Sequence, residues 1–285
     1  MVKPAVRRKA AGHLRTDYDI SERRATQVMK LHRSTMRYVG RPDRSTELRH
    51  KLQEMVAAYP RYGYRMITDK LRFEGWKVNH KKVYRIYREE GLQLPKRRRK
   101  RLRNLARQPI LLPEQMNQRW SMDFMTDMLT DGRRFRTLNV LDDFTRECLA
   151  IEVAISIPGE RVARVLDQIA DERGYPEAIV IDNGPEFTGR ALDGWASQHG
   201  VKLQFIQPGK PSQNAFVESF NDKFRSELLN TNWFTDVWEA RKRIDAWRDE
   251  YNHERPHSSL GRIPPAFFAE RTLRPRDPVT SETDL

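Results

Sequence analysis

The sequence contains very little cysteine and no long hydrophobic run. Cys148 is the one cysteine among 285 residues, so no disulfide can form within the chain, and this usage fits a reducing cytosol. One cysteine and seven histidines give no zinc-finger spacing. No apolar stretch reaches membrane-spanning length, and the start, MVKPAVRRKAAGHLR, has no apolar segment like that of a signal peptide. We therefore expect a cytoplasmic protein with no membrane partner.

Acidic residues are scarce in the first part of the chain. Residues 1–108 hold 31 Lys and Arg against 10 Asp and Glu, a net charge of +21, whereas residues 109–285 hold 22 against 29, a net charge of −7. This asymmetry indicates a nucleic-acid-binding region joined to a separate chemical core. The alternative is a basic surface that is simply solvated.

Helical periodicity dominates this basic part. Residues 17–39 have the apolar spacing of a helix, a short break and a second helix, so we expect a helical, helix-turn-helix segment over residues 1–42. Residues 43–58 predict another helix. The stretch YPRYGYRMITDKLRFEGW predicts one more helix, which Gly75 ends.

A candidate DNA-reading helix follows Asn79, a residue suited to cap a helix. Val83, Ile86 and Tyr87 share its apolar face. The outer face is basic, as in a recognition helix that enters the major groove, and we expect a helix-turn-helix DNA-binding domain over residues 43–94. The DNA contacts predicted on this face are His80, Lys81, Lys82, Arg85 and Arg88.

A basic run follows this domain. Residues 95–108, PKRRRKRLRNLARQ, carry eight basic side chains. Such a run neutralises phosphates, and we predict a basic linker over residues 95–116. Its predicted DNA contacts are Arg97, Arg98 and Arg99. A solvated tether is the alternative, and it is compatible with the same charge.

From residue 117 the pattern becomes that of an α/β domain. WSMDFMTDML, RFRTLNVLDDF and ECLAIEVAI predict three consecutive strands, with a hairpin turn at Asp131 and Gly132. A helix after Pro158, a strand at EAIVID, a helix near residues 191–198 and a strand at KLQFIQP follow. With a last helix near residues 213–230, this is the element order of an RNase H-like core with a mixed five-stranded sheet. We place that core at residues 117–232 and a C-terminal helical region and tail at residues 233–285.

Three acidic residues stand beside or within apolar runs of this core. Asp123 lies in RWSMDF, Asp182 in IVIDNGPEF and Glu218 in PSQNAFVESF, with 58 residues between the first two and 35 between the last two. Burying a charge is costly unless something pairs with it, and converging carboxylates suit hard cations such as Mg²⁺. Two such cations about 3.5–4 Å apart can activate an attacking oxygen and stabilise a leaving one at a phosphodiester.

Other acidic residues compete with Asp123 for this role. Asp127 lies four residues further on and would share a strand face with it, although we expect it to be nearer the strand end and more exposed. Asp142 and Asp143 end the second strand, and we interpret them as turn residues or as support behind the site.

The helix near residues 213–230 bears on the third carboxylate. An apolar residue recurs at every fourth position, which predicts a buried stripe and places Glu218 and Arg225 on the opposite side. The predicted stripe is Phe216, Phe220, Phe224 and Leu228. An arginine beside a metal site can hold a phosphate, and the alternative is a surface arginine paired with Asp222 or Glu227. The DNA contacts predicted in the core are Lys210, Lys223 and Arg225.

These blocks together resemble the B-frame product of bacterial insertion-sequence transposases, the family whose two overlapping frames join by frameshifting, within the retroviral-integrase (DDE) superfamily. The resemblance covers about residues 43–268. It is carried by Trp120-x-x-Asp123, DGRRFRTLNVLDDFTREC, the DNGPEF block that begins at Asp182, PGKPSQNAFVESFN, Arg225 seven residues beyond Glu218, and the tail YNHERPHSSLGRIPPAFF.

The resemblance implies a divalent-metal-dependent DNA transposase. In such a protein Asp123, Asp182 and Glu218 are catalytic and bind two Mg²⁺ ions, for which Mn²⁺ can substitute. The implied reaction cleaves the element ends to leave a 3′-hydroxyl and transfers that strand into target DNA or the other end. The implied partners are DNA with terminal inverted repeats, target DNA, further copies of the chain on that DNA, and the A-frame protein or a fusion with it. The implied location is the nucleoid of a bacterial cytoplasm.

Two other functions stay open at this point. One is an RNase H-like nuclease or resolvase that only hydrolyses DNA, and the other is a non-catalytic DNA-binding protein that represses or competes at the ends. The amino-terminal helix-turn-helix and the YNHERPH tail favour transposition over simple hydrolysis, and the three carboxylates argue against a protein without catalytic activity.

Overall fold

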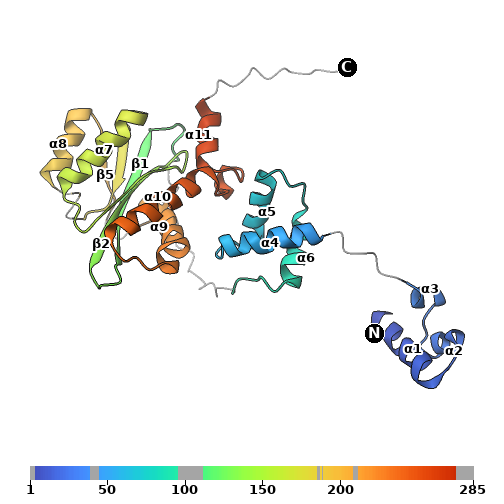
Figure 1. The fold of residues 1–285 in the computed structure, drawn as a ribbon. Coiled ribbons are helices and arrows are strands. Elements are labelled where there is room, and N and C mark those ends of the chain that lie inside the picture. Colours follow the sequence, from blue (N-terminus) through green and yellow to red (C-terminus); the bar gives the residue numbers. More distant parts are fainter. Residues whose placement is uncertain are drawn as a thin grey trace, which may run out of the picture. The chain divides into compact units, whose positions relative to one another are not determined.

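The computed structural model describes residues 4–38, 45–95, 112–184, 187, 189–207 and 211–273. The chain divides into two units, Met1–Lys51 and Leu52–Leu285. The first unit contains α1 (Pro4–Tyr18), α2 (Glu22–Val28) and α3 (Arg33–Met36), drawn in blue in Figure 1, and α4 (Thr46–Ala58) begins in it. No described helix is both long and apolar enough to cross a bilayer.

Two helices, α5 (Tyr64–Phe73) and α6 (His80–Glu89), begin and end near the residues that the sequence predicts. Gly75 follows α5 with a φ of +89°, a conformation that glycine adopts without a steric penalty. Asn79 caps α6, because its side chain accepts a hydrogen bond from the backbone N–H of Lys81 at 2.8 Å. Val83, Ile86 and Tyr87 are buried, as their spacing predicts.

A mixed five-stranded sheet forms the centre of the second unit, as the sequence predicts. Its strands are β1 (Arg119–Met128), β2 (Arg134–Asp142), β3 (Cys148–Ala154), β4 (Ala178–Ile181) and β5 (Lys202–Phe205), in the order β3-β2-β1-β4-β5. β1 pairs antiparallel with β2 and parallel with β4. Gly132, with a φ of +85°, lies in the predicted hairpin turn between β1 and β2.

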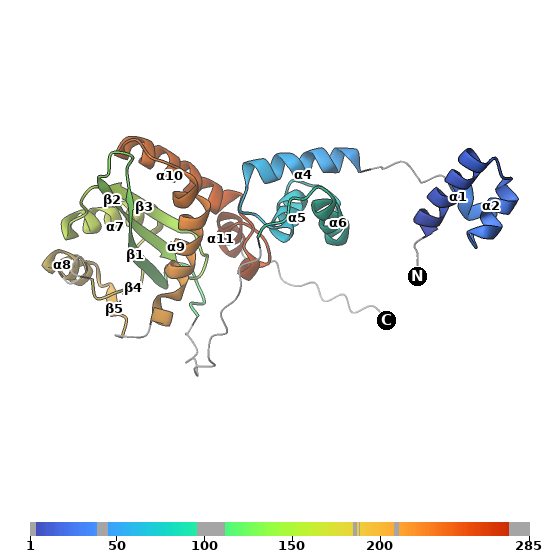
Figure 2. The ribbon, with the colours of Figure 1, turned by 90° about the horizontal axis from the view of Figure 1, so that it is seen from below.

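Helices cover both faces of this sheet. Figures 1 and 2 show α8 (Arg190–His199) and α10 (Val237–His253) on opposite sides of it. α7 (Gly159–Arg173) packs with α8, and α9 (Ala215–Glu227) packs with α10. The chain continues through α11 (Pro265–Leu273).

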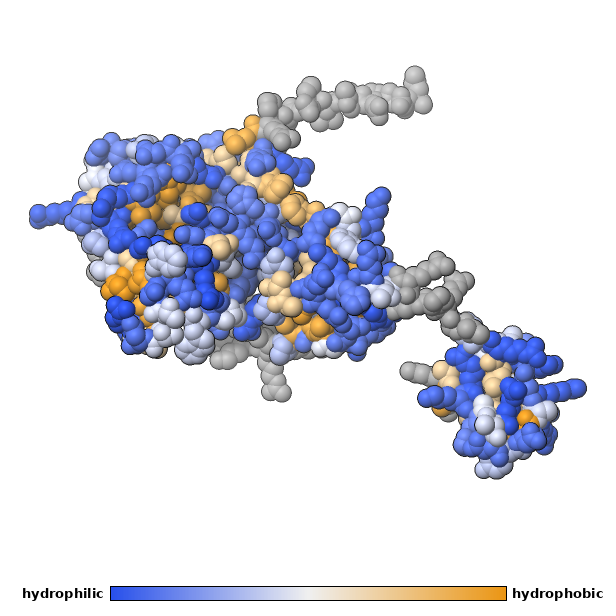
Figure 3. All heavy atoms as spheres, viewed as in Figure 1, coloured by the Kyte–Doolittle hydropathy of each residue, from blue (hydrophilic) through white to orange (hydrophobic). Residues whose placement is uncertain are grey.

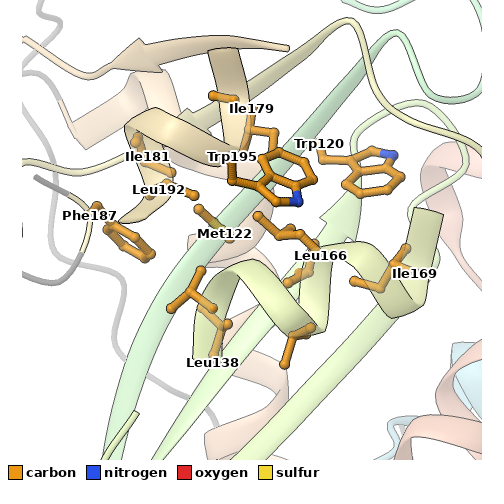
Figure 4. Packing of buried hydrophobic residues seen from close by; sticks show 14 of the residues in the cluster. Trp120, Met122, Leu138, Leu166, Ile169, Ile179, Ile181, Phe187, Leu192 and Trp195 are labelled. Atoms are coloured by element: carbon orange, nitrogen blue, oxygen red, sulfur yellow. The ribbon is translucent and has the colours of Figure 1, made fainter. Parts of the chain in front are cut away.

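The alternation of side chains along β1 decides which residues meet which helices. Trp120 and Met122 join the cluster that contains the side chains of α7 and α8, shown in Figure 4. Met125 joins the cluster of α9 and α10 on the other face. Because alternate residues of a strand share a face, Asp123 lies on the same side as Met125 and faces α9.

The end of α10 and the tail that follows it are tied to the sheet domain by polar contacts. Asn252 pairs with the backbone of Cys148, accepting from its N–H and donating to its carbonyl, both at 2.9 Å. Arg255 is buried and donates to both carboxylate oxygens of Glu227, at 2.6 and 3.0 Å. The tail motif therefore fixes the edge strand β3 and the end of α9, so it has a structural role in the sheet domain.

The helical region that contains α5 also contacts this tail. The ammonium of Lys70, whose side chain is only 4% exposed, lies 2.7 Å from a carboxylate oxygen of Glu254. Arg262 pairs with Asp69 at 2.9 Å. A lysine at this depth needs a partner of opposite charge, so the pair with Glu254 helps to fix α5 to the tail.

Candidate active site

The sheet brings Asp123 and Asp182 together. Asp123 lies within β1, and Asp182 directly follows β4, the parallel neighbour of β1. The last registered pair is Ser121 with Val180. Two further residues along each strand lead to Asp123 and Asp182, and neighbouring strands lie about 4.8 Å apart.

α9 adds Glu218 to this edge. Asn221, one turn after Glu218 on the same helix, donates from Nδ2 to Oδ2 of Asp123 at 2.8 Å. Asn214, at the start of α9, donates to the carbonyl of Met122 at 3.3 Å. These two contacts fix the first turns of α9 against β1, with Glu218 exposed to solvent between them.

The pKa values of Asp123 and Glu218 are both raised from their usual range. Burial, together with the charges of Asp182 and Glu218, raises the pKa of Asp123 to about 6, although hydrogen bonds from the backbone of Phe124 and the side chain of Asn221 act in the opposite direction. Burial also raises the pKa of Glu218, and the charge of Asp222 adds to the effect. A cation placed among these groups would relieve the repulsion.

The donor chemistry at this place fits a hard divalent cation, because carboxylate oxygens are the ligands that Mg²⁺ prefers. Among the described residues, no group of three or more His, Cys, Asp or Glu side chains is arranged so that it could hold a metal ion. β1 and its parallel neighbour β4 carry Asp123 and Asp182 to one edge of the sheet, and the contact of Asn221 with Asp123 holds α9, which carries Glu218, against that edge.

Two of the competing acidic residues, Asp142 and Asp143, are engaged elsewhere. Asp142 accepts hydrogen bonds from the backbone N–H groups of Phe144 and Thr145, as a turn residue does. Asp143 is buried and accepts from Ser121 and Arg119, both at 2.6 Å. These contacts match the interpretation of the pair as turn and support residues.

Arg225 and Lys223 differ in their surroundings. Arg225 donates to the backbone carbonyl of Thr126 in β1 at 3.3 Å, whereas Glu227, one of its two expected alternative partners, is bound by Arg255. Lys223 donates to the carbonyl and hydroxyl oxygens of Ser219, at 3.0 and 2.9 Å. Burial, followed by the charge of Arg255, lowers the pKa of Lys223 to about 8.

The buried stripe of α9 differs from the prediction at one position. Phe220 and Phe224 are fully buried, Leu228 is buried, and Val217 joins them. Phe216 is only half-buried, and the guanidinium of Arg146 covers part of its ring, 3.6 Å from the centroid.

The predicted DNA contacts of α6 form an exposed basic face. His80, Lys81, Lys82, Arg85 and Arg88 are all exposed. Arg85 pairs with Glu89 at 2.8 Å, an ordinary pair one helical turn apart. Arg97, Arg98, Arg99 and Lys210 lie outside the described residues.

Two asparagines of the site were not predicted as site residues. Asn139 on β2 is completely buried, and its Nδ2 donates to Oδ1 of Asn221 at 2.6 Å. Two signals could have indicated them: Asn139 is a polar residue in an apolar strand, and Asn221 follows Glu218 by three residues on the same helix.

Comparison with known proteins bears on both parts of the chain. Two models of the integrase core domain match residues 113–211 and 199–265, and an HTH-like domain model matches residues 43–101. The chain is 47% identical over 259 residues to the insertion element IS407 uncharacterized 31.7 kDa protein of Burkholderia multivorans, covering 90% of this chain and 94% of that protein. It is 26% identical over 241 residues to transposase InsD for insertion element IS2D of Escherichia coli, covering 79% of each.

A solved structure is also similar. A chain of the simian T-cell lymphotropic virus intasome in complex with PP2A regulatory subunit B56 gamma aligns with a TM-score of 0.50 at 15% identity, covering 71% of this chain and 69% of that chain. At this identity the likeness concerns the fold alone. It agrees with the mixed sheet, whose strand order is β3-β2-β1-β4-β5.

Proposed function

The chain belongs to the family of insertion-sequence transposases with an integrase core, and we propose that it cleaves DNA at the ends of a mobile element and joins the freed strands to new DNA. The observation that carries this proposal is the meeting of three acidic residues at one edge of the sheet. Asp182 directly follows β4, the parallel neighbour of the strand that carries Asp123, and Asn221, one turn after Glu218 on α9, donates to Asp123 at 2.8 Å.

Asp123, Asp182 and Glu218 would hold two Mg²⁺ ions, for which Mn²⁺ can substitute. When bound, the ions supply activation of the attacking oxygen and stabilisation of the leaving oxygen. The chain's own residues position the metal ligands and the bound DNA. Asn221 orients the carboxylate of Asp123, and Arg225, on the same helix as Glu218, is available to a phosphate of the bound strand.

The proposed reaction is two phosphoryl transfers. In the first, a water oxygen bonds to phosphorus at the element end, the bond from phosphorus to the 3′-oxygen breaks, and that oxygen leaves as a 3′-hydroxyl after taking a proton. In the second, this hydroxyl oxygen bonds to a phosphorus of the other end or of target DNA and displaces a 3′-oxygen there. No covalent enzyme intermediate forms, so no Ser or Tyr nucleophile is required.

The basic amino-terminal part would bind the ends. The exposed face of α6 and the run at residues 95–108 supply positive charge to DNA phosphates. We propose that several copies of the chain assemble on paired ends, with the A-frame protein or its fusion as a further partner.

A cleavage assay tests the proposal. The substrate is an oligonucleotide that contains the element end, with Mg²⁺ present. Asp123→Asn, Asp182→Asn and Glu218→Gln should each abolish cleavage and joining while end binding stays nearly intact, because the amide keeps size but removes the charge. Asp127→Asn is the matched control on the same strand and should stay active.

Two results would contradict the proposal. Near-normal strand transfer by Asp123→Asn would remove that residue from the metal-binding set. Cleavage by the unmodified chain without any joined product would indicate a hydrolytic nuclease.

A further inference from the structure

The first described residues form a helical unit that the matching family models do not cover. Residues 4–38 precede the HTH-like match, which begins at residue 43. α1, α2 and α3 pack around a small core in which Ala11, Ala25 and Thr26 are buried.

α2 and α3 are joined by a tight turn at residues 29–32. The backbone N–H of Leu31 donates to the carbonyl of Thr26 at 2.9 Å, and Lys30 has a φ of +48°. This is the hydrogen-bond pattern of a helix that ends in a left-handed residue. His32 then caps α3 by accepting from the N–H of Ser34 at 3.3 Å. α2 and α3 are therefore two short helices joined by a tight turn, and α3 is a single helical turn of four residues.

The unit is also strongly basic. Residues 4–38 hold nine Lys and Arg against three Asp and Glu. The surface of this unit in Figure 3 is mostly hydrophilic. The positive charge favours a polyanion as its partner over an apolar protein surface.

Glu22 gathers several of these charges at α3. Its carboxylate accepts from Nε of Arg37 at 2.8 Å and lies 3.7 Å from Nε of Arg33 and 4.0 Å from Nη1 of Arg15. The hydrogen bond from Arg37 is the main cause that lowers the pKa of Glu22. One carboxylate thus contacts two exposed arginines, one in α3 and one directly after it, beside His32 and Ser34, and these residue types contact phosphates and base edges.

We propose that residues 4–38 are a second DNA-binding head, with α3 against the duplex, so that the chain contacts an element end at two separate segments. This inference rests on the proposed function, since it assumes that the bound DNA is the element end. α6 contacts one segment and α3 contacts the other.

Footprinting of the full chain on a duplex that carries the element end tests the proposal. The unmodified chain should protect two segments. Arg33→Gln combined with Arg37→Gln should remove one protected segment, weaken end binding by about tenfold or more, and reduce the salt slope by about two. The control, Arg134→Gln combined with Arg164→Gln, removes the same charge from two exposed arginines of β2 and α7 and should keep both segments.

A second variant keeps the test decisive if the double variant unfolds. Ser34→Glu places a negative charge on α3 without removing an arginine and should also erase one segment. A single protected segment for the unmodified chain would overturn the proposal, as would two segments that both variants retain. If the variants instead change only the mass of a protein complex, α3 is a protein contact. Two protected segments without cleavage would support this inference and contradict the proposed function.

Discussion

Asn221 donates a hydrogen bond from Nδ2 to Oδ2 of Asp123 at 2.8 Å. The orientation of that amide is fixed in turn by Asn139, whose Nδ2 donates to Oδ1 of Asn221 at 2.6 Å. Oδ1 of Asn139 is buried with no hydrogen-bond partner among the described residues, and such a group costs stability. We infer that the role of Asn139 is its hydrogen bond to Asn221. Through this bond, Asn139 helps to hold the amide that orients Asp123.

Replacement of Asn221 or Asn139 by Ala should impair catalysis more than DNA binding. Without the amide, Asp123 loses the group that orients it, and residues that orient a metal ligand typically contribute about 10–100-fold to metal affinity or activity. The measurements are kcat at saturating DNA and the Mg²⁺ concentration at half-maximal rate. Direct calorimetric titration with Mg²⁺ gives a readout besides activity.

Asn232→Ala is the matched control for these two variants. Asn232 lies after α9 and donates to the carbonyl of Leu228 at 2.8 Å, so its loss removes a hydrogen bond of similar kind. A kcat and a Mg²⁺ requirement that stay unchanged in Asn221→Ala would exclude the positioning role.

The central part of this architecture follows from local pattern. In β1 a polar residue stands between Met122 and Phe124 within an apolar run, so the sequence already places Asp123 on a strand. The side chain of Asn79 caps α6. Gly75 ends α5, because a residue without a side chain adopts a positive φ without a steric penalty. Such signals need no knowledge of distant neighbours.

Contacts between distant segments could not be read in this way. Asn139 and Asn221 meet only because α9 packs against the sheet, and the ring of Phe216 is covered by Arg146, which comes from the turn between β2 and β3. α1 has only Ala11 buried, so its sequence has no broad apolar stripe. Tertiary packing decides each of these features.

Arg225→Ala should slow joining more than it lowers stability. Arg225 bonds to the carbonyl of Thr126, three residues beyond Asp123 on β1, at 3.3 Å, which places its guanidinium near the edge where the carboxylates meet. A charge-assisted contact to a DNA phosphate contributes about 1.5–3 kcal/mol, or roughly tenfold to a hundredfold in rate if it forms only in the transition state. Rates of hydrolysis and strand transfer should be compared with the melting temperature.

Arg225→Lys serves as the control, because it keeps the charge but not the planar fork. It should retain part of the joining rate. If Arg225→Ala leaves both rates and the melting temperature as they are in the unmodified chain, the arginine has no role at the site.

The exposed face of α6 should determine part of the salt dependence of end binding. Each neutralised phosphate contributes a slope near −0.9 in log K against log salt concentration. Lys81→Ala combined with Lys82→Ala should therefore reduce the slope by about two, whereas Lys242→Ala combined with Arg164→Ala, in α10 and α7, should leave it unchanged. Equal slopes for the two double variants would show that α6 does not face the phosphates.

His257 should make the second unit sensitive to acid. It is 9% exposed, and its Nε2 lies 3.0 Å from the hydroxyl of Tyr251. Burial, with the charges of Lys223, Arg255 and Arg146, lowers its pKa from 6.5 to about 3. The unfolded chain therefore binds a proton at this residue between these two pH values and the folded chain does not. The contribution of this residue to stability is thus complete above pH 6.5 and falls as the pH decreases toward 3.

Urea unfolding at pH 7.0 and 5.5 should show an extra loss of about 1 kcal/mol from this residue. His257→Gln should remove that extra loss, whereas His253→Gln, at an exposed histidine near the end of α10, should preserve it. An equal loss in His257→Gln and the unmodified chain would mean that His257 does not control the acid response.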